Sequence, residues 1–338
     1  NNTIAYSLNG TTWRGLGNSI FNDGRGVVWN GDIYVAVGSN VNSTNTIATS
    51  LDGINWTPGG NPFGNDGTGA KGFGVAWNGD KFVAVGQAVV NILYSSDGLT
   101  WSHGQGAGVT GLGWESVAWG GDKFVAGGDQ SLVYSSDGVT WTAGTGLPNT
   151  AIDSIVWGGD KFVAAGDDGR IYYSNDGTSN WTAANNNSKI FNQTTHGVTW
   201  NGSKFVAVGD GNIAANPSIA HSSDGTTWTL VTGSSSVLLG GYSVTWNGNK
   251  FVAVGEGMNA SDPTIAYSVD GENWTGAGNP FGGNSAIGRG ICGNPKVGPV
   301  DIPSKIIIDE GGALEFDFGE YYNSDITNIT MRIKAEEE

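Results

Sequence analysis

A seven-residue motif recurs seven times along the chain and constrains its architecture more than any other feature. The consensus is Ser-x-Asp-Gly-x-Thr-Trp, and successive copies are 40 to 47 residues apart. The copies end at Trp13, Trp56, Trp101, Trp141, Trp181, Trp228 and Trp274. A repeat of this length that is rich in strand and turn signals is typical of propellers and solenoids. We therefore expect the motif to build the scaffold, and the differences between copies to carry the function.

One repeat contains the signals for four antiparallel strands. In residues 74–101, two runs rich in β-branched and aromatic residues, 74–77 and 81–85, flank Asn78-Gly79, a favoured hairpin turn. A second hairpin turns at Ser95-Ser-Asp-Gly98. Four such strands form one propeller blade. The first two strands are almost continuously apolar, as expected for strands covered on both faces by neighbouring blades. The tryptophans that end the first strand, such as Trp77, are expected to pack between blades.

Counting these units predicts an all-β, seven-bladed propeller over residues 1–300. Six complete units begin at Val27, Val75, Val117, Ile155, Val198 and Val244. Residues 4–13 match the second half of a unit and residues 288–291 match the start of one. The two ends are expected to share the closing blade, which would remove exposed sheet edges. Because the chain begins in mid-repeat, we also expect a processed form or a fragment.

The strand register of the closing blade stays open. Residues 292–300 align loosely with a second strand, although Pro299 fits a central strand poorly; residues 305–308 are the alternative. Residues 301–338 are predicted to form a short acidic, β-rich tail with alternating runs at 313–318 and 326–333. So short a segment is a poor independent core. It is expected to pack on the propeller or to add strands to another chain, which would produce self-association through terminal strands.

The repeated turn resembles the Asp-box, or BNR, repeat of sialidase-like propellers. That resemblance implies a structural hairpin in which the Asp side chain binds backbone amides and the Trp packs beneath the turn. The residues that match the Asp are Asn9, Asp52, Asp97, Asp137, Asp176, Asp224 and Asp270. Two copies depart from the pattern, since Asn9 replaces the Asp in the first and an extra residue lengthens the fifth. The resemblance implies a fold rather than an activity, because the family includes enzymes, receptors and assembly factors.

One position varies in chemistry while its surroundings stay nearly constant. Two residues before the first apolar residue of each innermost strand, the chain has Arg25, Phe73, Glu115, Asp153, His196, Tyr242 and Arg289. These residues are predicted to form a ring at the mouth of the central channel, on the end opposite the Asp-box turns. The ring is a candidate ligand-binding site, in which Arg side chains bind an oxyanion or Glu115 and Asp153 act on a sugar. Alternatively, the same side chains pair with one another across blades.

Two further features have competing interpretations. Acidic residues follow the second strand of four units, at Asp129, Asp167, Asp210 and Glu256; they are either cation ligands or solvated turn residues. The identical loops 60–64 and 278–282 place Phe63 and Phe281 just after an Asp-box Trp. These loops are either repeated docking points with exposed Phe side chains or the remains of a recent duplication.

Composition excludes several classes of partner. The 338 residues contain 31 acidic and 15 basic side chains, which disfavours nucleic acid and anionic membranes. No apolar run is long enough to span a membrane, and one cysteine excludes a cysteine-based metal cluster. We predict no metal and no cofactor. Scarce Cys and Lys with abundant Asn and Gly favour an extracellular location or the surface of a cell or virus particle. Possible glycosylation sites are Asn42, Asn186, Asn192 and Asn259.

Enzyme signatures are weak. The chain has five arginines and lacks the Phe/Tyr-Arg-Ile-Pro motif that marks sialidases, and its three histidines lack zinc-ligand spacing. We therefore predict a non-catalytic structural or adhesive propeller, such as the repeating subunit of a fibre. A glycan-binding propeller is the alternative, and a glycoside hydrolase of sialidase-like fold is the third hypothesis.

Overall fold

The computed structural model describes residues 2–39, 44–64, 69–109, 113–147, 149–211, 217–257, 259, 261–281 and 288–293. The chain divides into two units, Asn1–Gly298 and Pro299–Glu338. The second unit, which contains the predicted tail 301–338, lies outside the described residues, so the tail stays a prediction. Within the described residues, no helix combines the length and apolar character needed to cross a membrane.

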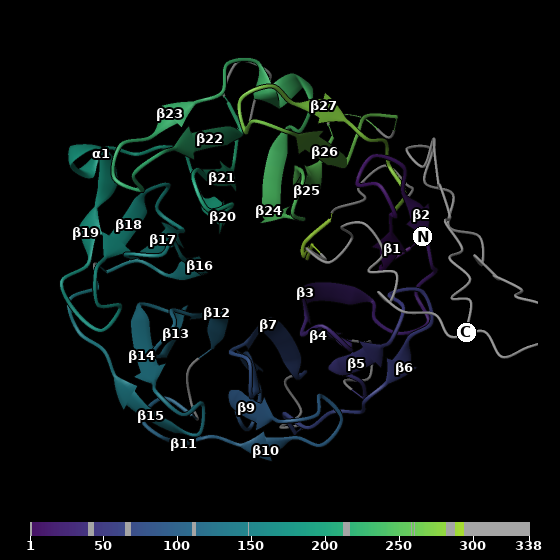
Figure 1. Ribbon diagram of the computed structural model, residues 1–338, viewed down its shortest axis with the longest axis vertical. Coiled ribbons are helices and arrows are strands. Elements are labelled where there is room, and N and C mark those ends of the chain that lie inside the picture. Colours follow the sequence, from purple (N-terminus) through teal and green to yellow (C-terminus); the bar gives the residue numbers. More distant parts are fainter. Residues whose placement is uncertain are drawn as a thin grey trace, which may run out of the picture. The chain divides into compact units, whose positions relative to one another are not determined.

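The first unit is built from six four-stranded antiparallel sheets arranged around a centre (Figure 1). In chain order their strands are β3 (Asp23–Trp29), β4 (Tyr34–Ser39), β5 (Ile47–Ser50), β6 (Thr57–Pro58); β7 (Lys71–Trp77), β8 (Phe82–Gln87), β9 (Ile92–Ser95), β10 (Ser102–His103); β12 (Trp114–Trp119), β13 (Phe124–Gly128), β14 (Ser131–Ser135), β15 (Thr140–Ala143). The remaining three are β16 (Ile152–Trp157), β17 (Phe162–Gly166), β18 (Ile171–Ser174), β19 (Thr182–Ala183); β20 (Thr195–Trp200), β21 (Phe205–Gly209), β22 (Ile219–Ser222), β23 (Thr229–Leu230); β24 (Gly240–Trp246), β25 (Phe251–Glu256), β26 (Ile265–Ser268), β27 (Thr275–Gly276). The all-β propeller architecture is confirmed.

Smaller elements connect or extend these blades. The strand β11 (Gln105–Gly106) adds parallel to β15 at the outside of its blade. A single turn, α1 (Ala184–Asn187), and a 3₁₀ turn, η1 (Ser234–Ser236), precede the fifth and sixth innermost strands. In α1, Asn185 and Asn186 have positive φ, a conformation that Asn tolerates better than most residues.

The prediction of seven blades is wrong: the structure has six blades of four strands. The N-terminal half-repeat forms only the two-stranded sheet β1 (Ala5–Tyr6) and β2 (Arg14–Gly15). Residues 288–293 run between β24 and β3 but belong to no strand. Turn and strand signals predicted each hairpin locally, but the closing blade needed ladder pairing between the two ends of the chain. Of the two alternatives for its second strand, 292–300 and 305–308, all but residues 292 and 293 lie outside the described residues, and these two belong to no strand.

The core lies between blades. The second strands, β4, β8, β13, β17, β21 and β25, are almost wholly buried. Phe205 on β21 is 1% exposed, and its ring lies 4.2 Å from that of Trp200 and 6.2 Å from that of Trp228. Both tryptophans and Phe205 belong to a cluster that also contains Val163 and Ile171 of the preceding blade. Packing between neighbouring blades therefore holds the innermost strands, and any side chains they carry, in fixed positions.

Candidate functional site

Six of the predicted ring residues share one backbone feature. Each is the unpaired residue of a β-bulge in an innermost strand, where the ladder with the second strand skips one position. The bulged residues are Arg25, Phe73, Glu115, Asp153, His196 and Tyr242. A bulge leaves one residue outside the ladder and redirects its side chain. The innermost strands surround the centre in Figure 1, so the bulges place one side chain per blade at equivalent positions around it.

Residues 288–293 supply the seventh ring residue, Arg289. A Cβ built on Gly290 would lie 1.8 Å from the carbonyl oxygen of Arg25, and one on Gly26 would lie 2.8 Å from that of Phe73. Four of the seven ring residues are followed by a Gly, and at Gly26 and Gly290 the backbone of the next ring residue comes too close for a Cβ. The other three are followed by Ser116, Ser154 and Ser243.

His196 connects three consecutive blades. Its Nδ1 lies 3.1 Å from Oδ2 of Asp153, and its Nε2 lies 3.1 Å from Oδ1 of Asp210. The imidazole ring stacks on Tyr242 at 4.7 Å. Burial alone would lower the pKa of His196, but the hydrogen bonds and charges of the two carboxylates raise it to about 9. The imidazole is therefore a cation at neutral pH, with both ring nitrogens donating.

The two carboxylates respond differently to this cation. Burial raises the pKa of Asp153, against the hydrogen bond and charge of His196. Burial alone would also raise the pKa of Asp210, but the hydrogen bond and charge of His196 hold that pKa below its usual value. The contacts with His196 thus outweigh burial in their effect on the pKa of Asp210, whereas burial outweighs them at Asp153.

The basic side of the ring is organised by Asp23. Its Oδ2 accepts a hydrogen bond of 2.8 Å from Nε of Arg25, and its Oδ1 lies 3.4 Å from Nε of Arg289. The Arg25 guanidinium lies 4.7 Å from the centre of the Phe73 ring, and that of Arg289 lies 5.4 Å from the centre of the Tyr242 ring. Ion pairs and cation–π contacts therefore fix both guanidinium groups.

Glu115 stands apart from these pairs. Within the described part of the chain, its carboxyl group has no hydrogen bond or ion pair. Burial raises the pKa of Glu115 to about 7. The positive charge of Arg25 lowers this pKa, and the negative charges of Asp153 and Asp129 raise it. Glu115 is consequently a half-ionised carboxyl at neutral pH, and Arg25 is the strongest cationic influence on it.

The structure thus joins six of the seven sequence-predicted ring residues by contact, all except Glu115. Continuous contacts run from Phe73 through Arg25, Asp23, Arg289, Tyr242 and His196 to Asp153. Sequence reasoning missed Asp23, whose signal was its place two residues before Arg25 on the same strand. Two of the acidic residues that follow the second strands also act on the ring: Asp210 binds His196, and the charge of Glu256 adds to burial in raising the pKa of Tyr242. Among the described residues, no cluster of His, Cys, Asp or Glu is arranged to hold a metal ion.

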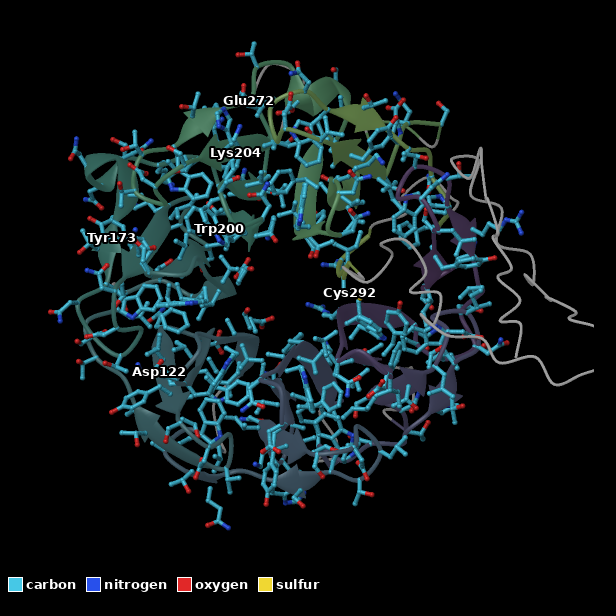
Figure 2. The ribbon with its side chains drawn as sticks, in the orientation of Figure 1. Asp122, Tyr173, Trp200, Lys204, Glu272 and Cys292 are labelled. Carbon is cyan, nitrogen blue, oxygen red and sulfur yellow. The ribbon has the colours of Figure 1, made fainter. Side chains whose placement is uncertain are left out.

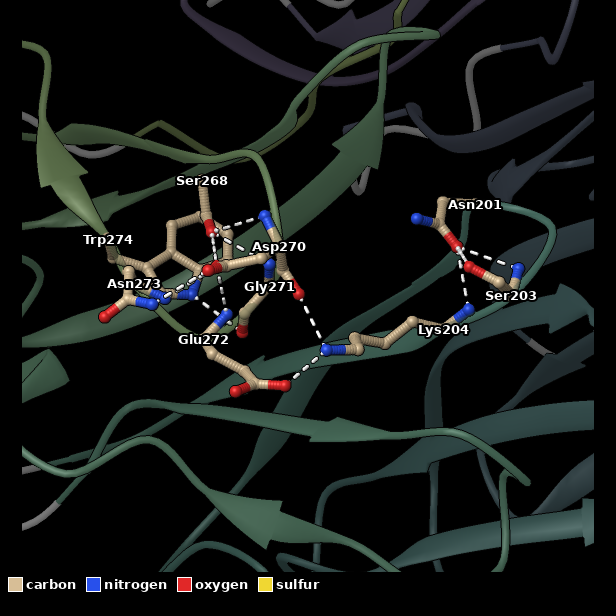
Figure 3. A network of polar contacts seen from close by, with 9 residues as sticks. All are labelled: Asn201, Ser203, Lys204, Ser268, Asp270, Gly271, Glu272, Asn273 and Trp274. Atoms are coloured by element: carbon tan, nitrogen blue, oxygen red, sulfur yellow. Dashed lines mark hydrogen bonds and ion pairs between the residues drawn. The ribbon is translucent and has the colours of Figure 1, made fainter.

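The repeated Ser-x-Asp-Gly turns form the opposite end of the blades and share one hydrogen-bond pattern. In Figure 3, Oδ1 of Asp270 accepts hydrogen bonds of 2.8 Å from the backbone N–H groups of Glu272 and Asn273, and the Gly271 N–H donates to Oγ of Ser268. Nε1 of Trp274 donates to the Gly271 carbonyl oxygen at 3.0 Å. The corresponding carboxylates accept from the same two positions at Asp52, Asp97, Asp137, Asp176 and Asp224, as does the amide oxygen at Asn9.

A lysine ties one such turn to the next blade. The backbone N–H of Lys204 donates a hydrogen bond to Oδ1 of Asn201. Its side-chain Nζ donates to the Asp270 carbonyl oxygen at 2.8 Å and forms an ion pair with Glu272 (Figure 3). Figure 2 shows Lys204 and Glu272 near the periphery, away from the centre of the ring of blades. The contacts at this end of the molecule therefore stabilise the turns and join neighbouring blades.

Replacing Asp270 with alanine should lower the free energy of unfolding by about 1 kcal/mol, because two backbone N–H groups lose their acceptor. Asn9 makes the same two bonds, so Asp270→Asn should restore most of the loss at neutral pH. The hydrogen bond from the Asn273 backbone is the main cause that lowers the pKa of Asp270. Its charged form therefore stabilises the fold above the unfolded pKa near 3.8, and this contribution disappears as pH falls below that value. Urea unfolding at neutral and acidic pH checks this; equal losses in both variants would contradict it.

Other predicted positions are distributed over the surface and the core. Asn186, Asn192 and Asn259 are exposed, and the Asn259 amide donates a hydrogen bond to Asp262; Asn42 lies outside the described residues. Glycosylation stays a prediction. The interpretation of loop 60–64 as a docking point with an exposed Phe is wrong, because Phe63 is 0% exposed and belongs to the core between β4 and β8. Phe281 is partly buried beside Val254 and Ile265.

Comparison with known proteins identifies the fold only. No family model matches the chain, and no curated protein is significantly similar to it. A chain of the Mitotic Checkpoint Complex is 11% identical with a TM-score of 0.58, covering 80% of this chain and 84% of that one. A chain of the Nidogen/Laminin Complex is 12% identical with a TM-score of 0.52, covering 77% and 97%. The GH74 xyloglucanase from Xanthomonas campestris is 15% identical with a TM-score of 0.54, covering 81% of this chain but 40% of the enzyme chain.

The fold is a β-propeller. At these identities the likeness extends no further, since the same architecture occurs in an enzyme and in chains of protein complexes. Function must be argued from the molecule's own side chains and strand edges.

Proposed function

We propose that the protein is a non-catalytic structural or adhesive propeller, of the Asp-box kind, which works outside cells or on a cell or particle surface and self-associates by strand addition. The observation that carries the proposal is the edge of β1. In complete blades the strand equivalent to β1 is paired on both sides; β5, for example, lies between β4 and β6. Within the described residues, β1 pairs with β2 alone.

The open edge of β1 is the side turned away from β2. The Ile4 carbonyl oxygen accepts a hydrogen bond from the Leu16 N–H on the β2 side, so the polar groups of the neighbouring residue, Ala5, point to the other side. The equivalent residues of β5, Ile47 and Ala48, are 0% exposed, whereas Ile4 and Ala5 are only half-buried. An unpaired edge of this kind is a template for a strand from another chain.

The partner in this proposal is a second copy that donates a strand from its C-terminal region. The alternating runs at 313–318 and 326–333 have the pattern of half-buried strands. Addition of one copy's strand to the next copy's β1 is head-to-tail, and such contacts produce open filaments. The ring supports a non-catalytic interpretation, since Asp153 is engaged by His196 rather than held ready with Glu115 as a carboxylate pair.

Ala5→Pro tests the proposal because it removes the N–H that faces the open edge. We expect sedimentation velocity to show concentration-dependent oligomers for the parent chain, and monomers for the variant. The matched control is Leu230→Pro, which places Pro at the position that Pro58 already occupies in the outermost strand of another blade. A parent chain that stays monomeric at high concentration would sink the proposal, as would an Ala5→Pro variant that associates like the Leu230→Pro control. Circular dichroism of both variants checks that the blades remain folded.

A further inference from the structure

Three charged groups of the ring retain hydrogen-bonding capacity that no described residue uses. Arg25 and Arg289 contact Asp23 through Nε alone, so their terminal Nη atoms have no hydrogen-bond partner in the described part of the chain. The Glu115 carboxyl is also without a direct partner there. The other side of the ring is saturated, since His196 uses both ring nitrogens on Asp153 and Asp210.

The unused groups are adjacent in the ring. Arg289 and Arg25 come from neighbouring segments and share Asp23, while Phe73 separates Arg25 from Glu115. The Asp23 contacts and the rings of Phe73 and Tyr242 hold the two guanidinium groups before any ligand arrives. A planar guanidinium fork matches the two oxygens of a carboxylate, and pre-organisation lowers the entropic cost of binding.

The charged side chains of the ring restrict the class of ligand further. Among Arg25, Arg289 and Asp23, two guanidinium groups against one carboxylate leave a single positive charge, which the carboxylate of a ligand neutralises. The acidic residues around the rest of the mouth, among them Glu115, Asp153 and Asp210, repel a ligand with several negative charges. A ligand that presents a hydrogen-bond donor to Glu115 satisfies the remaining acceptor in the same step.

We propose that Arg25, Arg289 and Glu115 form a binding site for a small hydroxylated monocarboxylic acid. The carboxylate accepts hydrogen bonds from the Nη atoms of Arg25 and Arg289, and a hydroxyl group of the same molecule donates to Glu115. Phe73 and Tyr242 act as positioning residues, because they contact the guanidinium groups. This site is independent of strand addition at β1, so either proposal can fail alone.

Isothermal titration calorimetry with three probes tests the site. Glucuronate carries a carboxylate and hydroxyls on a six-membered ring, cyclohexanecarboxylate has the same ring size without hydroxyls, and sulfate is a bare oxyanion. At about pH 8 Glu115, with its pKa of about 7, is mostly ionised and accepts a hydrogen bond. We expect saturable glucuronate binding that is about tenfold tighter than that of either other probe.

Matched variants assign the binding to named groups. Arg25→Gln and Arg289→Gln should each weaken glucuronate binding about tenfold. Arg14→Gln makes the same charge change on exposed β2 and should leave binding unaltered. Glu115→Gln should reduce the preference for glucuronate over cyclohexanecarboxylate. Arg25→Lys retains the charge without the fork and should bind with intermediate affinity, which keeps the test decisive if a Gln variant is unstable.

Four results would overturn the proposal, three of which concern glucuronate and the variants. These three are absence of saturable glucuronate binding, equal affinity for glucuronate and cyclohexanecarboxylate, and a loss in Arg14→Gln that matches the loss in Arg25→Gln. Sulfate that binds more tightly than glucuronate also contradicts it, because a bare oxyanion leaves Glu115 unsatisfied.

Discussion

Replacing Phe205 with alanine is expected to lower the free energy of unfolding by about 3–5 kcal/mol, because the change leaves a cavity between two blades. The ring contacts Trp200 and Trp228 of its own blade. A Cβ built on Gly158 of the preceding blade would lie 2.1 Å from its Cζ atom, so the surroundings are packed tightly on that side too. Urea unfolding followed by tryptophan fluorescence measures the loss.

Two companions make this measurement specific. The Phe205→Leu variant should lose less free energy of unfolding than Phe205→Ala, because Leu retains much of the buried volume. Leu51, with 78% of its side chain exposed, is the surface control, and Leu51→Ala should change stability by less than about 0.5 kcal/mol. If Phe205→Ala costs no more than the Leu51 control, packing between blades does not hold this part of the molecule together.

His196→Ala is expected to cost about 2 kcal/mol at neutral pH. Removal of the imidazolium leaves Asp153 and Asp210 without their shared cation, in a site where their side chains are 25% and 16% exposed. The cost is smaller than for a fully buried pair, because water still reaches both carboxylates and because burial already raises the pKa of Asp153. His103→Ala removes an exposed histidine and serves as the control.

The same contact predicts a pH dependence. The folded pKa of His196, about 9, lies above the usual value of 6.5, so its stabilising contribution is complete below about pH 6.5 and is lost as pH rises through 9. Urea midpoints of the parent chain should therefore fall between pH 6.5 and pH 9.5, and the fall should be smaller in His196→Ala. Parallel pH profiles in the two proteins would show that His196 is not the group responsible.

The blade and the ring could be predicted from sequence because both depend on local signals. Asn78-Gly79 and Ser95-Ser-Asp-Gly98 fix hairpins through backbone conformation and side-chain hydrogen bonds, without help from distant residues. Aligning seven copies then isolated the one position with varying chemistry, and that position is the bulge in each innermost strand.

Features that depend on contact between distant segments could not be predicted in the same way. The closing blade required strands from both ends to pair, and β1 and residues 288–293 do not form that ladder. Phe63 has the sequence context of an exposed loop, yet it fills the space between β4 and β8. Asp23 became part of the site only when Arg289, far away in the chain, lay beside it.

The repeated bulge separates strand pairing from the display of a variable side chain, two roles that usually compete within one strand. Its residue takes no part in the ladder, so the hydrogen bonding of the sheet does not constrain its identity. The sequence already places six different amino acids there, from Phe73 to His196, on nearly interchangeable backbones. The ring can thus change one residue per blade by point substitution while the strand ladders keep the same register, and the contacts between ring residues, such as that of His196 with Asp153, decide which changes are tolerated.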